Sequence, residues 1–121
     1  MFREVLARAG GELPGCRGAA LVGLDGMVIE QWTAPGSAGP IGLEPVAAEV
    51  TSVIKAARLA SRNTDGDRLT ELTLKTSGWS GVVRAVGDDY FLILVTSPDA
   101  VLGRTRFVVE RAVPLIEREL G

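Results

Sequence analysis

The stretch Tyr90-Phe91-Leu92-Ile93-Leu94-Val95 decides the fold. It holds six apolar residues in a row with no polar residue at alternate positions, so a strand here must be covered on both faces. Burying five or six such side chains contributes on the order of 10 to 15 kcal/mol before opposing terms are counted. That is comparable to the net stability of a small domain. We therefore place residues 90–95 in the middle of a sheet.

The remaining apolar pattern predicts three helices and four further strands around this one. Residues 33–42, rich in Ala, Pro, Gly and Ser, indicate a surface loop between the two halves of the chain. Two local signals are specific: Asp25-Gly26 predicts a type I′ hairpin turn, and Pro114 predicts a kink or break in the last helix. The expected helices cover 1–9, 43–62 and, after the capping sequence Ser97-Pro98-Asp99, 97–120, and the expected strands cover 19–24, 27–32, 68–76 and 82–86.

These elements predict the order of the strands in space. A two-strand hairpin comes before the long helix and a three-strand meander follows it, and the two groups must share one sheet because an isolated hairpin is marginally stable. The most apolar strand of each group belongs in the middle, which gives the order 2-1-5-4-3. With the long helix on one face and the terminal helices on the other, the fold class is α/β (α+β), a three-layer α/β/α sandwich with an antiparallel-rich sheet.

Length and composition restrict the class of protein. The 121 residues, 46% apolar, fit one domain over 1–121. The net charge of -2 and the absence of a Lys/Arg block disfavour nucleic acid as a partner. No apolar run approaches the roughly 18 to 20 residues of a membrane span, so we expect no membrane insertion. The single cysteine fits a reducing compartment, and we expect a cytoplasmic protein.

The long helix 43–62 has two faces of different character. The solvent-exposed side of a helix normally carries many charged residues. The side of this helix opposite its apolar stripe carries fewer. Alanine can be used there for helix propensity alone, or small residues can let a second helix approach closely; we favour the second interpretation. The buried stripe is expected to be Leu43, Val46, Ala47, Val50, Val53, Ile54 and Ala57, and the small-residue stripe Ala48, Ser52 and Ala56, with Leu59 beside it.

The predicted sheet order leaves strand 68–76 at an edge. Open edges invite pairing with another chain unless they are blocked, and this strand has no proline. Its charges at Glu71 and Lys75, on either side of Thr73, would meet their opposites if two copies paired antiparallel. We therefore expect a homodimer in which these edges join and the small-residue stripes of the two long helices meet.

The sequence offers little chemistry of its own. It has no histidine, which removes the commonest catalytic base and metal ligand, so we expect no catalytic residues, no metal and no cofactor. Cys16 is expected to be a small structural residue, and the glycine-rich loop 36–42 lacks the Lys-Ser/Thr of a phosphate-binding loop. The carboxylate pairs at 65–67 and 88–89 suit tight turns. Trp32 and Trp79 either shield the rim of the sheet or contact a protein.

Three segments together resemble the Roadblock / dynein light chain family. They are Gly18-Ala19-Ala20-Leu21-Val22-Gly23-Leu24-Asp25-Gly26-Met27-Val28-Ile29, then Val86-Gly87-Asp88-Asp89-Tyr90-Phe91-Leu92-Ile93-Leu94, and finally Leu102-Gly103-Arg104 with Ala112 and Leu115. The chain is similar in length and element order to bacterial members, including the MglB-type regulators of polarity and motility. The resemblance implies a profilin-like fold and a homodimer with a continuous sheet and paired long helices.

The same resemblance implies a non-enzymatic scaffold or regulator that binds a small Ras-like GTPase and modulates its nucleotide cycle. On the long helix we expect Glu49, Lys55, Arg58 and Arg62 to contact this partner. Two other readings remain open: a structural adaptor in a motor or signalling complex, and a small-molecule sensor with a pocket beneath the glycine-rich loop. The arginines available to act on a bound GTPase are Arg58, Arg62, Arg68, Arg84 and Arg104.

Overall fold

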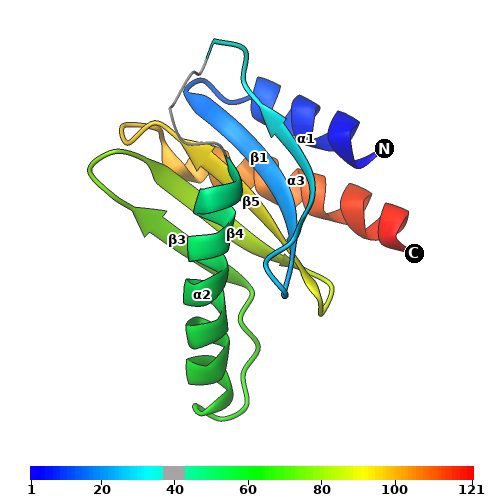
Figure 1. The fold of residues 1–121 in the computed structure, drawn as a ribbon, viewed down its shortest axis with the longest axis vertical. Coiled ribbons are helices and arrows are strands. Elements are labelled where there is room, and N and C mark those ends of the chain that lie inside the picture. The colour runs from blue at the N-terminus through cyan, green and yellow to red at the C-terminus, as the bar shows by residue number, and fades with distance from the viewer. Residues whose placement is uncertain (37–42) are drawn as a thin grey trace.

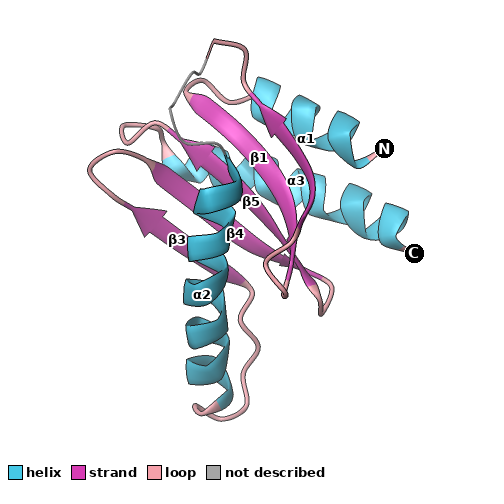
Figure 2. Cartoon of the chain, in the orientation of Figure 1, coloured by secondary structure: helices cyan, strands magenta, loops and turns pink. Residues whose placement is uncertain are grey.

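The computed structural model describes residues 1–36 and 43–121, and the glycine-rich loop falls largely outside this range. Three helices and five strands follow one another in the predicted order α-β-β-α-β-β-β-α (Figures 1 and 2). Their bounds are α1 Phe2–Gly11, β1 Cys16–Gly23, β2 Val28–Thr33, α2 Leu43–Arg62, β3 Glu71–Lys75, β4 Ser80–Val86, β5 Tyr90–Thr96 and α3 Leu102–Leu120.

The five strands form one sheet in the order β2-β1-β5-β4-β3, which confirms the predicted topology. All four pairings are antiparallel. β5 lies between β1 and β4, and its residues Phe91 to Thr96 are all buried, as a strand without a polar face requires. β3 is shorter than predicted, because pairing with β4 begins only at Glu71.

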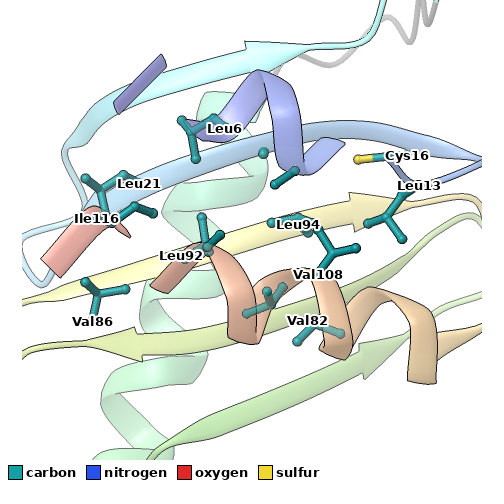
Figure 3. Close-up of a cluster of buried hydrophobic side chains, with 14 residues drawn as sticks. Leu6, Leu13, Cys16, Leu21, Val82, Val86, Leu92, Leu94, Val108 and Ile116 are labelled. Carbon is teal, nitrogen blue, oxygen red and sulfur yellow. The ribbon is translucent and has the colours of Figure 1, made fainter. Parts of the chain in front are cut away.

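The helices cover the two faces unequally. α1 and α3 lie together on one face, and α2 lies alone on the other, where its C-terminal half extends past the ends of the strands (Figure 1). Leu92 and Leu94 point from β5 into the core beneath α1 and α3, where they meet Leu6, Leu21 and Ile116 (Figure 3). The alternate β5 residues, Phe91 and Ile93 among them, form a second core with α2.

The turn between β1 and β2 differs from the predicted type I′ turn, although the hairpin itself is present. A type I′ turn needs positive φ at both central residues, whereas in this loop only Gly26 has positive φ, at 87°. The Gly26 amide donates to Gly23 O at 2.9 Å, and the Met27 amide donates to Asp25 Oδ1 at 3.0 Å. The loop therefore holds a turn over Leu24 and Asp25 followed by one left-handed glycine.

The start of α3 also differs from the prediction. Ser97 does not cap the helix, because its hydroxyl donates to Asp99 Oδ1 at 2.8 Å, a bond that lowers the pKa of that carboxyl. α3 begins at Leu102 without a side-chain cap and runs through Pro114 to Leu120 as one helix. Ala112 and Ile116, buried on either side of the proline, keep the helix on the sheet.

Val53, predicted to be buried, is exposed, and so is Leu115 in the last helix. Val53 of α2 is 42% exposed and Leu115 of α3 is 37% exposed. Two threonines take sheet-facing places instead: Thr51 donates its hydroxyl to Ala47 O at 2.7 Å, and Thr105 donates to Val101 O at 3.5 Å. A buried threonine whose hydroxyl bonds to its own helix needs no other partner, so apolar spacing alone missed both.

The two tryptophans each lie against a glycine. A Cβ atom at Gly10 of α1 would lie 2.0 Å from Cζ3 of Trp32, and one at Gly81 of β4 would lie 2.8 Å from Cζ3 of Trp79. Trp32 packs on the core beneath α1 and α3, whereas Trp79 packs on the α2 core. Both rings are half-buried, so they shield the sheet rather than project from it.

Cys16 is a core residue at the start of β1. It is 7% exposed, and burial raises the pKa of its thiol from the ordinary 9.0 to about 11. The thiol is therefore protonated at neutral pH, and the protonated form is a poor nucleophile. This placement agrees with the structural role expected from the sequence.

The contact between Gly10 and Trp32 predicts opposite effects for two neighbouring alanine substitutions. Gly10→Ala should lower the free energy of unfolding by about 1 to 3 kcal/mol, because the added methyl overlaps the ring. Gly11→Ala, with no atom within 4 Å of the new Cβ, should be neutral or stabilise by up to about 1 kcal/mol. Urea unfolding followed by circular dichroism measures both, and equal stability of the two variants would contradict the assigned contact.

The buried thiol predicts a pH dependence of stability. Because the folded-state pKa of Cys16 lies above its unfolded value, its contribution is complete below about pH 9 and is lost as the pH rises through about 11. The free-energy difference between the parent protein and Cys16→Ala should shrink by roughly 2 kcal/mol over that interval. A difference that stays constant from about pH 8 to pH 11 would show that the thiol is not desolvated.

Candidate functional site

The outer edge of β3 is the most open part of the sheet. β3 pairs with β4 on one side only, and in the described part of the chain no strand lies on its other side. β2, at the opposite edge, is partly blocked: the Gln31 amide takes Oε1 of Glu30 as its acceptor at 3.1 Å. A donor that already has an acceptor is less available to another strand, so the two edges differ at this residue.

The side chains of Glu71, Thr73 and Lys75 all lie on the α3 face of β3, since they pair across the sheet with alternate residues of β4. Each of them has a partner within the chain. Glu71 contacts Arg84 at 3.5 Å and Arg106 at 3.0 Å, Thr73 accepts from Arg106 at 3.0 Å, and Lys75 donates to Pro98 O at 3.1 Å.

The opposite face of β3 is apolar and only half covered. Leu72 and Leu74 face the α2 layer, where they pack on the second core and remain half-buried. The backbone of α2 lies closest to β1 and β2, while its buried side chains share a core with β5 and with Val83 of β4. Val53, on the flank of α2 away from the hairpin, is exposed. The structure thus joins an open strand edge to an uncovered apolar surface.

The small-residue stripe of α2 is exposed, but its members do not share one direction. Successive helix residues turn by about 100°. Ser52 and Ala56 therefore lie on the crest, facing away from the sheet, while Ala48 and Leu59 lie on the flank toward the β1–β2 hairpin. Leu59 is 60% exposed and lines a cavity with Leu24 of that hairpin. The stripe therefore does not lie beside the β3 edge, because its crest faces away from the sheet and its other members face the hairpin.

The predicted partner-binding residues separate in a similar way. Lys55, Arg58 and Arg62 lie together on the hairpin flank and line, with Leu24 and Leu59, an open cavity of about 360 Å³. Arg58 donates to the backbone oxygen of Asp88 at 3.3 Å. Lys55 and Arg62 have no ion-pair partner among the described residues. Glu49 is exposed on the outer side of the same helix, apart from this basic group.

Of the five candidate arginines, two are held by carboxylates. Arg68 forms an ion pair with Asp88, and Arg84 contacts Glu71 and Glu110, each at 3.5 Å. Arg104 lies near the start of α3 and lines a separate cavity. Arg58 and Arg62 are thus the candidates on α2 without a carboxylate partner in the described structure. They also line a second cleft of about 360 Å³, between the end of α2, residues 66–69 and the β4–β5 turn.

The carboxylate pairs lie in turns, as their sequences predict. Asp65 and Gly66 both have positive φ, and the pair 88–89 joins β4 to β5. Over residues 1–36 and 43–121, no group of three His, Cys, Asp or Glu side chains is placed to hold a metal ion. Within the same ranges, no helix is long and apolar enough to cross a membrane.

Sequence reasoning missed Arg106, whose guanidinium binds both Glu71 and Thr73. The available signal was its position next to the sheet-facing Thr105, which places it on the flank of α3. That signal alone does not say which strand the side chain reaches. β3 and α3 are separated by two strands in the chain, so only the three-dimensional sheet order brings the two together.

Comparisons with known proteins agree with this architecture. The family model described as the Roadblock/LC7 domain matches residues 3–96. The chain is 25% identical to gliding protein MglB from Thermus thermophilus, with 97% of this chain and 86% of that one covered and a TM-score of 0.86. It is 26% identical to an MglB with a tetrameric arrangement, with 97% and 85% covered and a TM-score of 0.87. No curated protein matches the sequence.

The structural likeness extends to profilin. Acanthamoeba castellanii profilin IA is 14% identical, the full length of both chains is covered, and the TM-score is 0.61. At this identity the likeness concerns the fold alone, and it confirms the profilin-like arrangement expected from the sequence. Roadblock proteins are generally regulatory or adaptor domains and not enzymes. The match over residues 3–96 shows that the chain belongs to the Roadblock/LC7 domain family.

Proposed function

We propose that this chain forms a homodimer that acts as a non-enzymatic scaffold or regulator: it binds a small Ras-like GTPase and modulates the nucleotide cycle of that GTPase. Family membership and the likeness to MglB support this function. The observation that carries it is the open edge of β3 beside a half-covered apolar surface. A surface of this kind is suited to a second copy of the same chain.

In the proposed dimer, the β3 strands of two copies pair antiparallel, so that Glu71, Thr73 and Lys75 lie along the junction. The α2 helix of each copy then approaches the β3 flank of the other. Val53 and the crest residues Ser52 and Ala56 provide an apolar and sterically open contact there, which close helix packing favours. The half-buried Leu72 and Leu74 become covered by the same association.

The GTPase then binds the surface formed by the hairpin flank of α2. Lys55, Arg58 and Arg62 supply positive charge next to the exposed Leu59, with Ala48 closer to the start of the helix and Glu49 on its outer side. Apolar side chains ringed by charges are typical of protein-binding surfaces. An effect on the nucleotide cycle would come from positioning the switch segments of the GTPase, with Arg58 and Arg62 the arginines nearest to it.

Two substitutions on opposite flanks of α2 separate self-association from partner binding. Val53→Glu should weaken the dimer at least roughly tenfold, because it places a charge in the apolar contact between subunits. Leu59→Glu should leave the dimer intact and weaken GTPase binding instead. Both positions are exposed in the single chain, so both variants should fold. Sedimentation velocity over a concentration series measures the association, and a parent protein that stays monomeric throughout would contradict the dimer.

Charge reversal on the hairpin flank tests the partner surface. Arg62→Glu should weaken binding to the GTPase by roughly tenfold at low salt and less at high salt, because exposed charges are screened. Arg118→Glu, the same change on α3 in the opposite layer, is the matched control and should have no effect. Calorimetric titration against the small GTPases of the same cell, in both nucleotide states, measures this. Negligible binding to all of them would favour the structural adaptor or the small-molecule sensor.

A further inference from the structure

Arg106, in the second turn of α3, connects this helix to the edge strand. Its Nε donates to Glu71 Oε2 and its Nη2 donates to Thr73 Oγ1, each at 3.0 Å. Glu71 and Thr73 are two residues apart, so their side chains point to the same face of β3. One planar guanidinium therefore spans two consecutive side chains along the strand, which the point charge of a lysine cannot do in the same way.

The same contacts belong to a balanced ionic network. The other oxygen of Glu71 lies 3.5 Å from Arg84 Nη1 on β4, and Arg84 in turn lies 3.5 Å from Glu110, one turn after Arg106 on α3. Two arginines and two glutamates thus alternate in charge along a path from α3 through β3 and β4 back to α3. Glu71 is only about one quarter exposed (25%), so its position depends on both cations.

The network contacts a strand that is short and has few other contacts to hold it extended. This strand has five residues and one neighbouring strand. Ordering the backbone costs about 1 to 2 kcal/mol per residue, so an edge strand that frays must pay this cost again whenever another chain pairs with it. A strand already held in extended form binds more tightly because less freedom is lost on association.

We propose that Arg106 is a positioning residue for self-association: by bridging Glu71 and Thr73 it holds β3 extended against α3, so that the free edge is ready to pair with a second copy. This inference rests on the proposed dimer. It also changes the expected role of two charges. Glu71 and Lys75 are already engaged within their own chain, so the dimer does not depend on ion pairs between them across the junction.

The experiment compares two arginines of the same helix. Arg106→Gln should raise the dimer dissociation constant by roughly tenfold, which corresponds to about 1.4 kcal/mol. Arg111→Gln makes the same charge change but removes a contact with Glu12 of α1, far from β3, and should leave the constant unchanged. Arg106→Lys, which keeps the charge and loses the bridge, should fall between the parent protein and Arg106→Gln. Sedimentation velocity measures all four proteins at two salt concentrations.

Two further measurements distinguish positioning from a loss of global stability. Urea unfolding below the dissociation constant should give the same transition for Arg106→Gln and Arg111→Gln, while amide hydrogen exchange at 71–75 should be faster in Arg106→Gln alone. In a Thr73→Val background, which keeps a β-branched residue and removes the acceptor, the effect of Arg106→Gln on association should be smaller.

Equal dissociation constants for Arg106→Gln and Arg111→Gln would overturn the inference while leaving the dimer itself in place. An equally strong weakening of the parent and Arg106→Gln dimers by salt would also overturn it, since that result assigns the association to ion pairs between subunits. A parent protein that is monomeric at every concentration would instead overturn the proposed dimer, and with it the role of Arg106.

Discussion

The structure depends on a central strand that has no polar face. β5 must be covered on both sides, and the chain has three helices for the purpose. A helix is about 10 Å wide with its side chains, whereas five strands spaced about 4.8 Å apart span nearly 20 Å. α1 and α3 together cover one face, but α2 alone can cover only half of the other. The half-covered part lies at β3, where Leu72 and Leu74 are only half-buried, whereas the α2-facing Val83 of β4 is buried. The proposed second copy would cover this part of the sheet.

The two faces of β3 differ in chemistry: one is polar and the other is apolar. On the α3 side, its polar side chains are fixed by Arg106, Arg84 and the carbonyl group of Pro98. These contacts fix the direction of the β3 side chains, and Glu71, at their centre, is one quarter exposed. On the α2 side, Leu72 and Leu74 pack on the second core and remain half-buried. β3 thus combines a backbone that is held in place on one face with an apolar, partly exposed surface on the other.

The sequence was sufficient for topology because topology follows from apolar patterning. The buried run 90–95, the hairpin and the meander fixed the strand order, and it is confirmed in full. Local details that depend on hydrogen-bond geometry were not accessible. Whether Asp25 takes positive φ, and whether Ser97 caps a helix or binds Asp99, depends on competition between bonds of similar strength. Val53 was misplaced because helical spacing cannot reveal that α2 lies off the centre of the sheet.

The candidate surface was only partly predictable for the same reason. An edge strand and a helix rich in small residues can be recognised in the sequence, but the direction of each helix face depends on how α2 crosses the strands. Leu59 and Val53 therefore fall on opposite flanks although both appear in apolar patterns. Contacts between distant segments, such as those of Arg106, come only from three-dimensional neighbours and leave no local signature.

Glu30 bears on how large the proposed assembly could grow. If both edge strands could pair equally well with another copy, each added molecule would leave one edge strand unpaired. Copies could then assemble into open-ended fibres. At the β2 edge, the carboxylate of Glu30 accepts a hydrogen bond from the Gln31 amide. In the proposed dimer, this bond would make further growth through the β2 edge less favourable than the first pairing at β3.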